Sequence, residues 1–176
     1  LALFSVLPHG DRVIACAYDA ARDVAATAGF HCVCLWNGLT GEQLHIFDGC
    51  GHSFVAFTAK GQLLADQNSF DSVSLCDLET KNVAMCKYAG FLRGARIAGG
   101  ASADGLVFIA CEDGSFRLFN EETGVCLSSF QHHRAGELRS VAMKEGLVLL
   151  ASKNAGVMVL RPNDKRALRY HGADSG

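Results

Sequence analysis

Short apolar runs alternate with turn residues along the whole chain, and residues 112–130 show the pattern most clearly. There Asp113 and Gly114 precede a run in which Phe116 and Leu118 alternate with polar neighbours. A polar turn and a second apolar run follow. Both positions of an Asp-Gly turn tolerate a positive φ, so the pattern is typical of a β-hairpin. The stretch therefore predicts two antiparallel strands.

The same pattern recurs at a regular spacing. Its anchor positions, Phe30, Phe70, Asp113 and Asn154, lie 40, 43 and 41 residues apart. The preceding apolar run repeats in step, at Val24, Leu64, Val107 and Val148. A period near 40 residues with four short strands per unit is typical of β-propeller blades. We therefore predict an all-β fold of about four blades, each a four-stranded antiparallel sheet.

The repeat sets the expected organisation of the chain. The units are predicted at residues 8–48, 49–89, 90–131 and 132–171, and residues 1–7 take the place of an outer strand from a preceding blade. The inner strands are predicted at 13–18, 54–59, 95–101 and 138–144. A stack of blades that does not close exposes apolar faces and strand edges. We expect missing blades or a second chain to complete the propeller.

The repeats resemble those of the WD40 propeller family. The residues that carry the resemblance are Leu35-Trp36-Asn37, Leu75-Cys76-Asp77 and Leu118-Phe119-Asn120, followed by Thr40-Gly41 and Thr123-Gly124. The resemblance implies a larger propeller, usually of about seven blades. It also implies structural roles for His9, Trp36, Asp113, Gly114, Phe119 and His133. The family's turn aspartate is present at Asp113, whereas Phe30 and Phe70 occupy that column in the first two units.

The composition bears on which kinds of partner the chain is expected to bind. Hydrophobic residues make up 49% of the chain, charged residues 19%, and the formal net charge is −2. This balance supplies a core and gives no reason to expect direct nucleic-acid binding. No apolar run is long enough for a transmembrane helix, so no membrane partner is expected. Most of the eight cysteines fall in apolar strands without a CxxC motif, which favours a reduced, intracellular and cytoplasmic protein over a disulfide scaffold.

The sequence contains few residues that would support an enzymatic function. The chain has no P-loop, HExxH, nucleophile elbow or dinucleotide fingerprint. Cys32 and Cys34 share one face of a strand, but a metal site would need further ligands, and the neighbouring His31 is poorly spaced. We therefore predict no catalytic residue, no metal and no cofactor. The alternative is a propeller enzyme whose channel carries Asp66 and histidines.

The turns supply the candidate binding residues. Phe30 and Phe70, with the adjacent His31 and Asp71, occupy turn tips on a face that WD40 proteins commonly use for partners. Three arginines near the starts of inner strands should line the same rim: Arg12, Arg96 and Arg139. We predict a non-catalytic scaffold for other proteins of a complex. A subunit that joins a ribonucleoprotein assembly through protein contacts is a further alternative.

Overall fold

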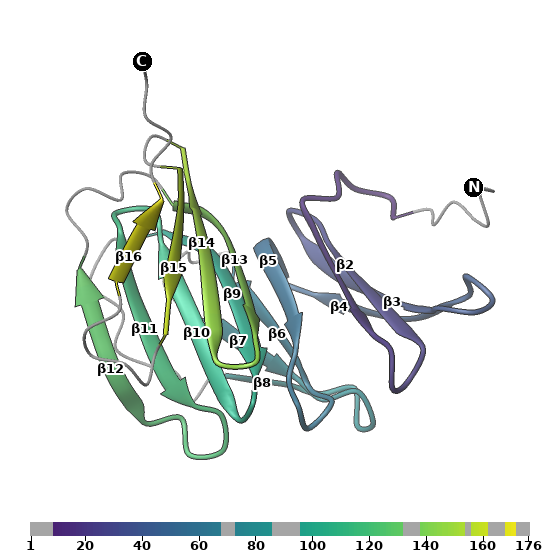
Figure 1. Cartoon of the computed structure of the whole chain (residues 1–176). Helices are drawn as coiled ribbons and strands as arrows, with labels where there is room; N and C mark the ends of the chain where they lie inside the picture. The colour runs from purple at the N-terminus through teal and green to yellow at the C-terminus, as the bar shows by residue number, and fades with distance from the viewer. Residues whose placement is uncertain are drawn as a thin grey trace. The chain divides into compact units, whose positions relative to one another are not determined.

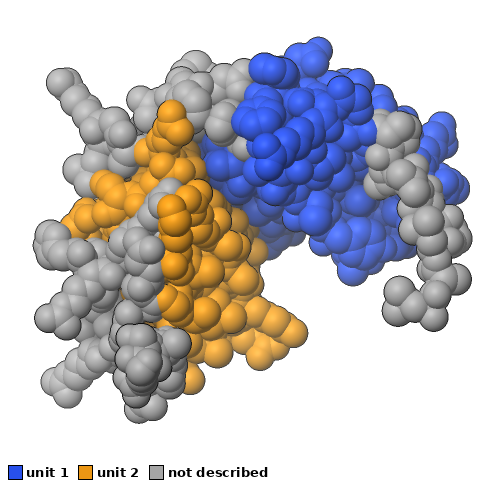
Figure 2. All heavy atoms as spheres, turned by 90° about the horizontal axis from the view of Figure 1, so that it is seen from above, with its two compact units in different colours: residues 1–86 blue, residues 87–176 orange. Residues whose placement is uncertain are grey.

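A computed structural model describes residues 9–67, 73–85, 96–131, 138–153, 156–161 and 168–171. Within these ranges every regular element is a β-strand (Figure 1). The chain divides into two compact units, residues 1–86 and 87–176, which Figure 2 colours separately. Each unit contains two four-stranded antiparallel sheets. The all-β prediction and the four-stranded antiparallel sheets are confirmed.

The first unit contains two sheets whose strands pair in sequence order. One sheet consists of β1 (Ala15–Asp19), β2 (Val24–Ala28), β3 (Cys32–Asn37) and β4 (Gln43–Asp48). The other consists of β5 (Cys50–Phe57), β6 (Leu63–Gln67), β7 (Val73–Cys76) and β8 (Val83–Met85). The short turns between successive strands make such a meander the simplest pairing.

The second unit repeats this order. Its first sheet consists of β9 (Ile97–Ala103), β10 (Leu106–Cys111), β11 (Ser115–Asn120) and β12 (Cys126–Gln131). Its second sheet consists of β13 (Leu138–Lys144), β14 (Leu147–Ser152), β15 (Gly156–Leu160) and β16 (Leu168–His171).

The core of the first unit lies between its two sheets, with β5 against β1 and β2. Alternate residues of each strand point toward this layer, because the side-chain period of a strand is two. The buried side chains that form it are Ala26, Ala28, Val33, Leu35, Phe47, Cys50, Val55, Leu63, Ala65 and Cys76. Cys50 and Cys76 are therefore core residues of this layer, as expected for free cysteine in an apolar strand.

Aromatic stacking characterises the core of the second unit. The ring of Phe116 stacks on Phe108 at 5.4 Å between centroids and on Phe130 at 5.1 Å. Phe108 and Phe116 are buried with Leu138, Leu150 and other residues from the neighbouring sheet. The inner strands β9 and β13 pack closely, since a Cβ added at Gly99 would lie 3.4 Å from the backbone nitrogen of Val141.

One turn recurs in three of the four sheets. Asn37 and Asn120 end the third strand of their sheets, and Asp77 directly follows β7. Each accepts, through Oδ1, the backbone N–H groups two and three residues later. The threonine three residues on, at 40, 80 and 123, then accepts an N–H from the residue two further along. Such turns are a local preference of Asn, Asp and Thr. The repeated motif in the sequence thus encodes a repeated turn.

The residue after this threonine adopts a left-handed backbone. Gly41 and Gly124 have φ values of 74° and 71°, whereas Lys81 occupies the same column with φ 61°. For a residue with a Cβ, this left-handed conformation is higher in free energy than it is for glycine. We predict that Lys81→Gly raises the free energy of unfolding by about 0.5–1 kcal/mol. Urea unfolding measures the change in the free energy of unfolding. Gly41→Ala adds a Cβ at the equivalent position and should lower stability by a similar amount. Equal stability of the Lys81 variant and the parent would contradict the prediction.

Candidate functional site

The carboxylate of Asp11 organises one end of the first sheet. It lies in the loop before β1 and accepts the N–H of Arg12 at 2.6 Å, of Phe30 at 2.8 Å and of His31 at 3.3 Å. The backbone N–H of Arg12 is the largest cause that lowers the pKa of Asp11. Partial desolvation raises this pKa, and the N–H groups of Phe30 and His31 lower it further, so that the net shift is downward. The carboxylate therefore stays charged at neutral pH and ties the β2–β3 turn to the preceding loop.

The side chains around this anchor are open to a partner. Arg12 and His31 are exposed and Phe30 is half-buried. The next two residues add apolar surface, because Val13 is 46% exposed and Ile14 41% exposed. We call these five residues (Arg12, Val13, Ile14, Phe30, His31) the Asp11 rim. The structure thus brings together three of the predicted binding residues: Arg12, Phe30 and His31.

A hydrogen-bonded histidine lies near this rim. The Nε2 atom of His9 is 3.0 Å from the carbonyl oxygen of Thr27, and the Nε1 of Trp36 donates to Oγ1 of Thr27 at 2.7 Å. A carbonyl oxygen only accepts, so Nε2 of His9 carries the proton. The structural roles predicted for His9 and Trp36 fit these contacts.

Close packing at Gly29 holds this loop against the sheet. A Cβ built there would lie 2.7 Å from Cε1 of His9 and 2.8 Å from Oδ2 of Asp11. Only glycine leaves room for both side chains. The loop before β1 and the β2–β3 turn are therefore one tightly packed structure.

Two thiols lie beside the histidine. The Sγ atoms of Cys32 and Cys34 are 4.0 Å apart, and one ring nitrogen of His9 lies within 4.8 Å of both. Burial raises the pKa of Cys32 and raises the pKa of Cys34 to about 12. Both groups are therefore thiols at neutral pH. In the sequence the histidine adjacent to this pair is His31, which is poorly spaced for a metal site, whereas the structure places His9 beside the two thiols.

The remaining predicted rim residues fall into two groups. Phe70 and Asp71 lie outside the described residues, as does His133. Arg96 and Arg139 are exposed and lie at the beginnings of β9 and β13, which pack against each other in the second unit. Arg96 also accepts the N–H of Glu112 through its carbonyl oxygen at 2.8 Å.

The third repeat contains the predicted aspartate turn. Oδ1 of Asp113 accepts both the N–H of Ser115 at 2.8 Å and its hydroxyl at 2.6 Å. Gly114 has a φ of 84°, which suits glycine, and Phe119 is fully buried in β11. These contacts suit the structural roles that the resemblance implied for Asp113, Gly114 and Phe119.

Asp66 is a structural acceptor in the first unit. Its side chain is 1% exposed and accepts the N–H and the hydroxyl of Ser53, at 2.9 Å and 2.6 Å, and the N–H of Phe54 at 3.4 Å. A buried carboxylate used in this way ties β5 to β6 and offers no surface to a substrate. These contacts favour a structural role for Asp66 over the catalytic role that the enzyme alternative would give it.

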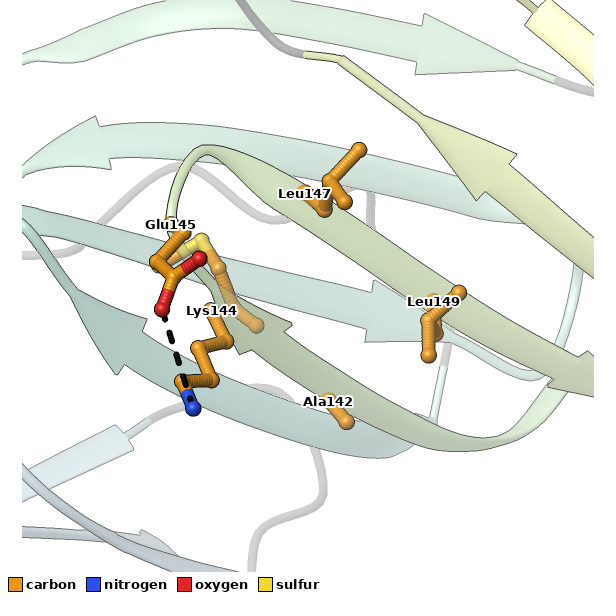
Figure 3. A pocket seen from close by; sticks show the side chains of 6 residues that line it. Ala142, Lys144, Glu145, Leu147 and Leu149 are labelled. Atoms are coloured by element: carbon orange, nitrogen blue, oxygen red, sulfur yellow. Dashed lines mark ion pairs between the residues drawn. The ribbon is translucent and has the colours of Figure 1, made fainter.

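A small hollow opens on β13 and β14 (Figure 3). Its volume is about 230 Å³, and its lining is mainly apolar: Ala142, Met143, Leu147 and Leu149. Lys144 and Glu145 border it, with Nζ and Oε1 3.7 Å apart. Both side chains are more than 80% exposed, so this pair adds little stability. The hollow lacks the converging polar groups that position a reactant.

Two features of the first unit were not predicted from the sequence. Asp11 was not among the candidate residues, and the approach of His9 to Cys32 and Cys34 was not predicted. The position of His9 could have been inferred in part, because the resemblance places this histidine in the loop before an inner strand. The place of that loop against the third strand follows from the fold and not from sequence spacing.

Comparisons with known proteins identify the fold. Neither the models of protein families nor the curated proteins give a match to this sequence. Solved structures do match. The RRP9 WD40 repeats are 15% identical with a TM-score of 0.75, and the match covers 93% of this chain and 52% of that one. The U3-55K structure is 14% identical with a TM-score of 0.72, covering 88% of this chain and 50% of that one.

A third similar structure is the computationally designed Ika4 protein, 19% identical with a TM-score of 0.67, where the match covers 89% of this chain and 95% of Ika4. The chain thus spans about half the length of the RRP9 and U3-55K structures, and nearly all of Ika4. The four sheets are the blades of a WD40-like β-propeller fold, as the resemblance implied. In the described part of the chain, no helix has the length and apolarity needed to cross a membrane.

Proposed function

We propose that this chain is a non-catalytic scaffold that binds other proteins as a subunit or adaptor of a multiprotein complex. The observation that carries the proposal is the Asp11 rim. There a charged side chain, two aromatic rings and two exposed aliphatic residues surround a backbone fixed by one carboxylate.

A rim of this kind suits an acidic partner segment. Arginine forms paired hydrogen bonds with carboxylates, and aromatic side chains add contact area at low entropic cost. Because Asp11 already fixes the turn, binding would order only side chains, which limits the entropic cost of association. The partner we propose is a protein surface that carries a carboxylate beside an apolar residue.

Other features support a binding role over catalysis. Asp66 is buried, and the hollow on β13 and β14 is mostly apolar. We also propose an intracellular, cytoplasmic location. It is supported by the free thiols among the described cysteines, several of which are buried in strands.

We further propose that additional blades, from the same protein or from a second chain, complete the propeller. Leu149 and Val157, on the face of β14 and β15 opposite the core, are 45% and 46% exposed. In β10 the residues on both faces are buried. An inner strand with apolar residues on both faces suits burial between two blades.

The rim is tested by a double substitution. In Arg12→Ala with Phe30→Ala, we expect at least about a tenfold drop in captured partner, because arginine and aromatic residues commonly dominate interface energies. Affinity capture of the tagged chain with quantitative mass spectrometry measures it. The fold should persist, since the backbone groups that Asp11 binds remain.

The matched control removes the same kinds of side chain at the other end of the same sheet. Arg22 lies in the β1–β2 turn, and Leu39, which is 62% exposed, lies in the β3–β4 turn. Arg22→Ala with Leu39→Ala should leave capture unchanged. Equal losses in the two double variants, with both chains folded by circular dichroism, would rule the rim out.

A further inference from the structure

We propose that His9, Cys32 and Cys34 form a binding site for a zinc ion that clamps the loop before β1 onto β3. The site uses two thiolates and one imidazole, the donor types that Zn²⁺ prefers. It is independent of the partner proposed for the Asp11 rim, although it would stiffen the loop that carries Arg12.

The spacing of the sulfur atoms fits the ion. Tetrahedral coordination with Zn–S bonds of about 2.3 Å places two sulfurs about 3.8 Å apart. Sγ of Cys32 and Sγ of Cys34 are 4.0 Å apart. They lie on one face of β3 because strand residues two apart point the same way. The third ligand atom, a ring nitrogen of His9, lies within 4.8 Å of both, a distance that small side-chain rotations shorten.

One ring nitrogen of His9 is available to bind an ion. Nε2 of His9 donates to the carbonyl of Thr27, so the lone pair of the neutral ring is on Nδ1. Nδ1 is buried and has no hydrogen-bond partner among the described residues. Zinc-binding histidines typically donate their other ring N–H to a carbonyl or carboxylate, which fixes the ring. A bound ion would satisfy an atom that is otherwise costly to bury.

The alternative chemistry for this thiol pair is a disulfide, and strand geometry opposes it. Residues two apart on a strand have Cα atoms about 6.6 Å apart, near the upper limit for a disulfide, and their Cβ atoms point in parallel. Cys32 is only partly buried, which gives an ion a path to the sulfurs. Zinc binding would release the two thiol protons and leave the fourth position of the tetrahedron to water or an outside ligand.

The chain offers a matched control pair. Cys50 and Cys76 have sulfurs 3.9 Å apart, are both buried, and belong to the same unit. No third potential ligand clusters with them among the residues that the structure describes. The hydrogen bond with Cys50, together with burial, raises the pKa of Cys76, so this pair also includes a protonated thiol. It differs from the proposed site chiefly in lacking the histidine.

The test titrates the full, reduced and metal-free chain with Co²⁺ and then displaces it with Zn²⁺. We expect one equivalent bound, with thiolate charge-transfer absorption typical of tetrahedral cobalt. Trp36, the only tryptophan, is two residues from Cys34 on the same strand, so cobalt should quench its fluorescence. Binding should disappear in Cys32→Ala with Cys34→Ala and persist in Cys50→Ala with Cys76→Ala.

Further variants make the result decisive. His9→Ala should weaken zinc binding by more than about 100-fold, because loss of an outer-shell partner alone costs 10–100-fold. If the double variant does not fold, Cys32→Ala, at the partly exposed position, provides the same test. Absence of stoichiometric binding, unquenched Trp36, or equal losses in the two cysteine pairs would overturn the proposal.

Discussion

Replacement of Phe108 by alanine is expected to lower the free energy of unfolding by about 3–5 kcal/mol, the usual cost of removing a buried aromatic side chain. Phe108 is 1% exposed on β10 and stacks against Phe116 at 5.4 Å. The neighbouring strands are held by their hydrogen bonds, so they cannot close fully over the space left behind. Most of the loss should therefore appear as a cavity cost.

Urea unfolding followed by far-UV circular dichroism measures this loss, because the signal reports both units. Trp36 fluorescence reports the first unit alone, since the tryptophan is unique and lies in β3. Phe108→Leu, which keeps most of the volume, should cost less than about 1.5 kcal/mol. Val125→Ala, at a residue that is 57% exposed, should change stability by less than about 0.5 kcal/mol. A Phe108→Ala chain as stable as this surface variant would contradict the packing described.

Asp66→Ala is the second large change that we expect. The carboxylate is buried and accepts three donors from Ser53 and Phe54. Alanine leaves those donors without their acceptor, and hydrogen bonds to a charged group are worth about 1.5–3 kcal/mol each. Because Ser53 is only partly buried and water can replace part of the loss, we expect a total of about 2–4 kcal/mol. β5 and β6 should separate more easily, and Trp36 fluorescence during urea unfolding measures the effect.

Two further variants separate this role from a simple charge effect. Asp66→Asn keeps one acceptor oxygen and should lose about half as much as Asp66→Ala. Glu42→Ala removes an exposed carboxylate from the same unit and should be nearly neutral. If Asp66→Ala and Glu42→Ala prove equally mild, the carboxylate does not hold the two strands together.

The sequence predicted strands well where the structure depends on neighbouring residues. The range expected for β13, residues 138–144, matches the one observed. β4, β11 and β12 follow turns in which Asn37, Asp113 or Asn120 accepts a backbone N–H group two residues further along. The same local preference explains why the Asn37 and Asn120 turns could be recognised from a motif.

The inner strands β1 and β5 were predicted less well. β1 begins at Ala15 instead of 13, and β5 begins at Cys50 instead of 54. The register between β5 and β6 is irregular between Cys50 and Val55. Alternation along one segment does not reveal where the partner strand ends or bulges, because that depends on pairing with residues more than ten positions away.

The candidate site was only partly visible in the sequence. Phe30, His31 and Arg12 were selected as binding residues from their turn positions, and the structure gathers them around Asp11. The carboxylate itself was missed, because its backbone donors at Phe30 and His31 lie about 20 residues away. Asp66 was named only in the enzyme alternative, and the donors that give it a structural role come from the adjacent strand.

By itself, the sequence determined the class of fold, because a repeat of about 40 residues and the alternation of apolar positions fix which faces of each strand are buried. It also determined the turns, whose hydrogen bonds close within four residues. Only the tertiary structure decided what lies over each face: His9 beside Cys32 and Cys34, and Asp11 beneath the rim. The physical reason is that these contacts depend on strand twist and loop packing, which the spacing of residues along the chain does not encode.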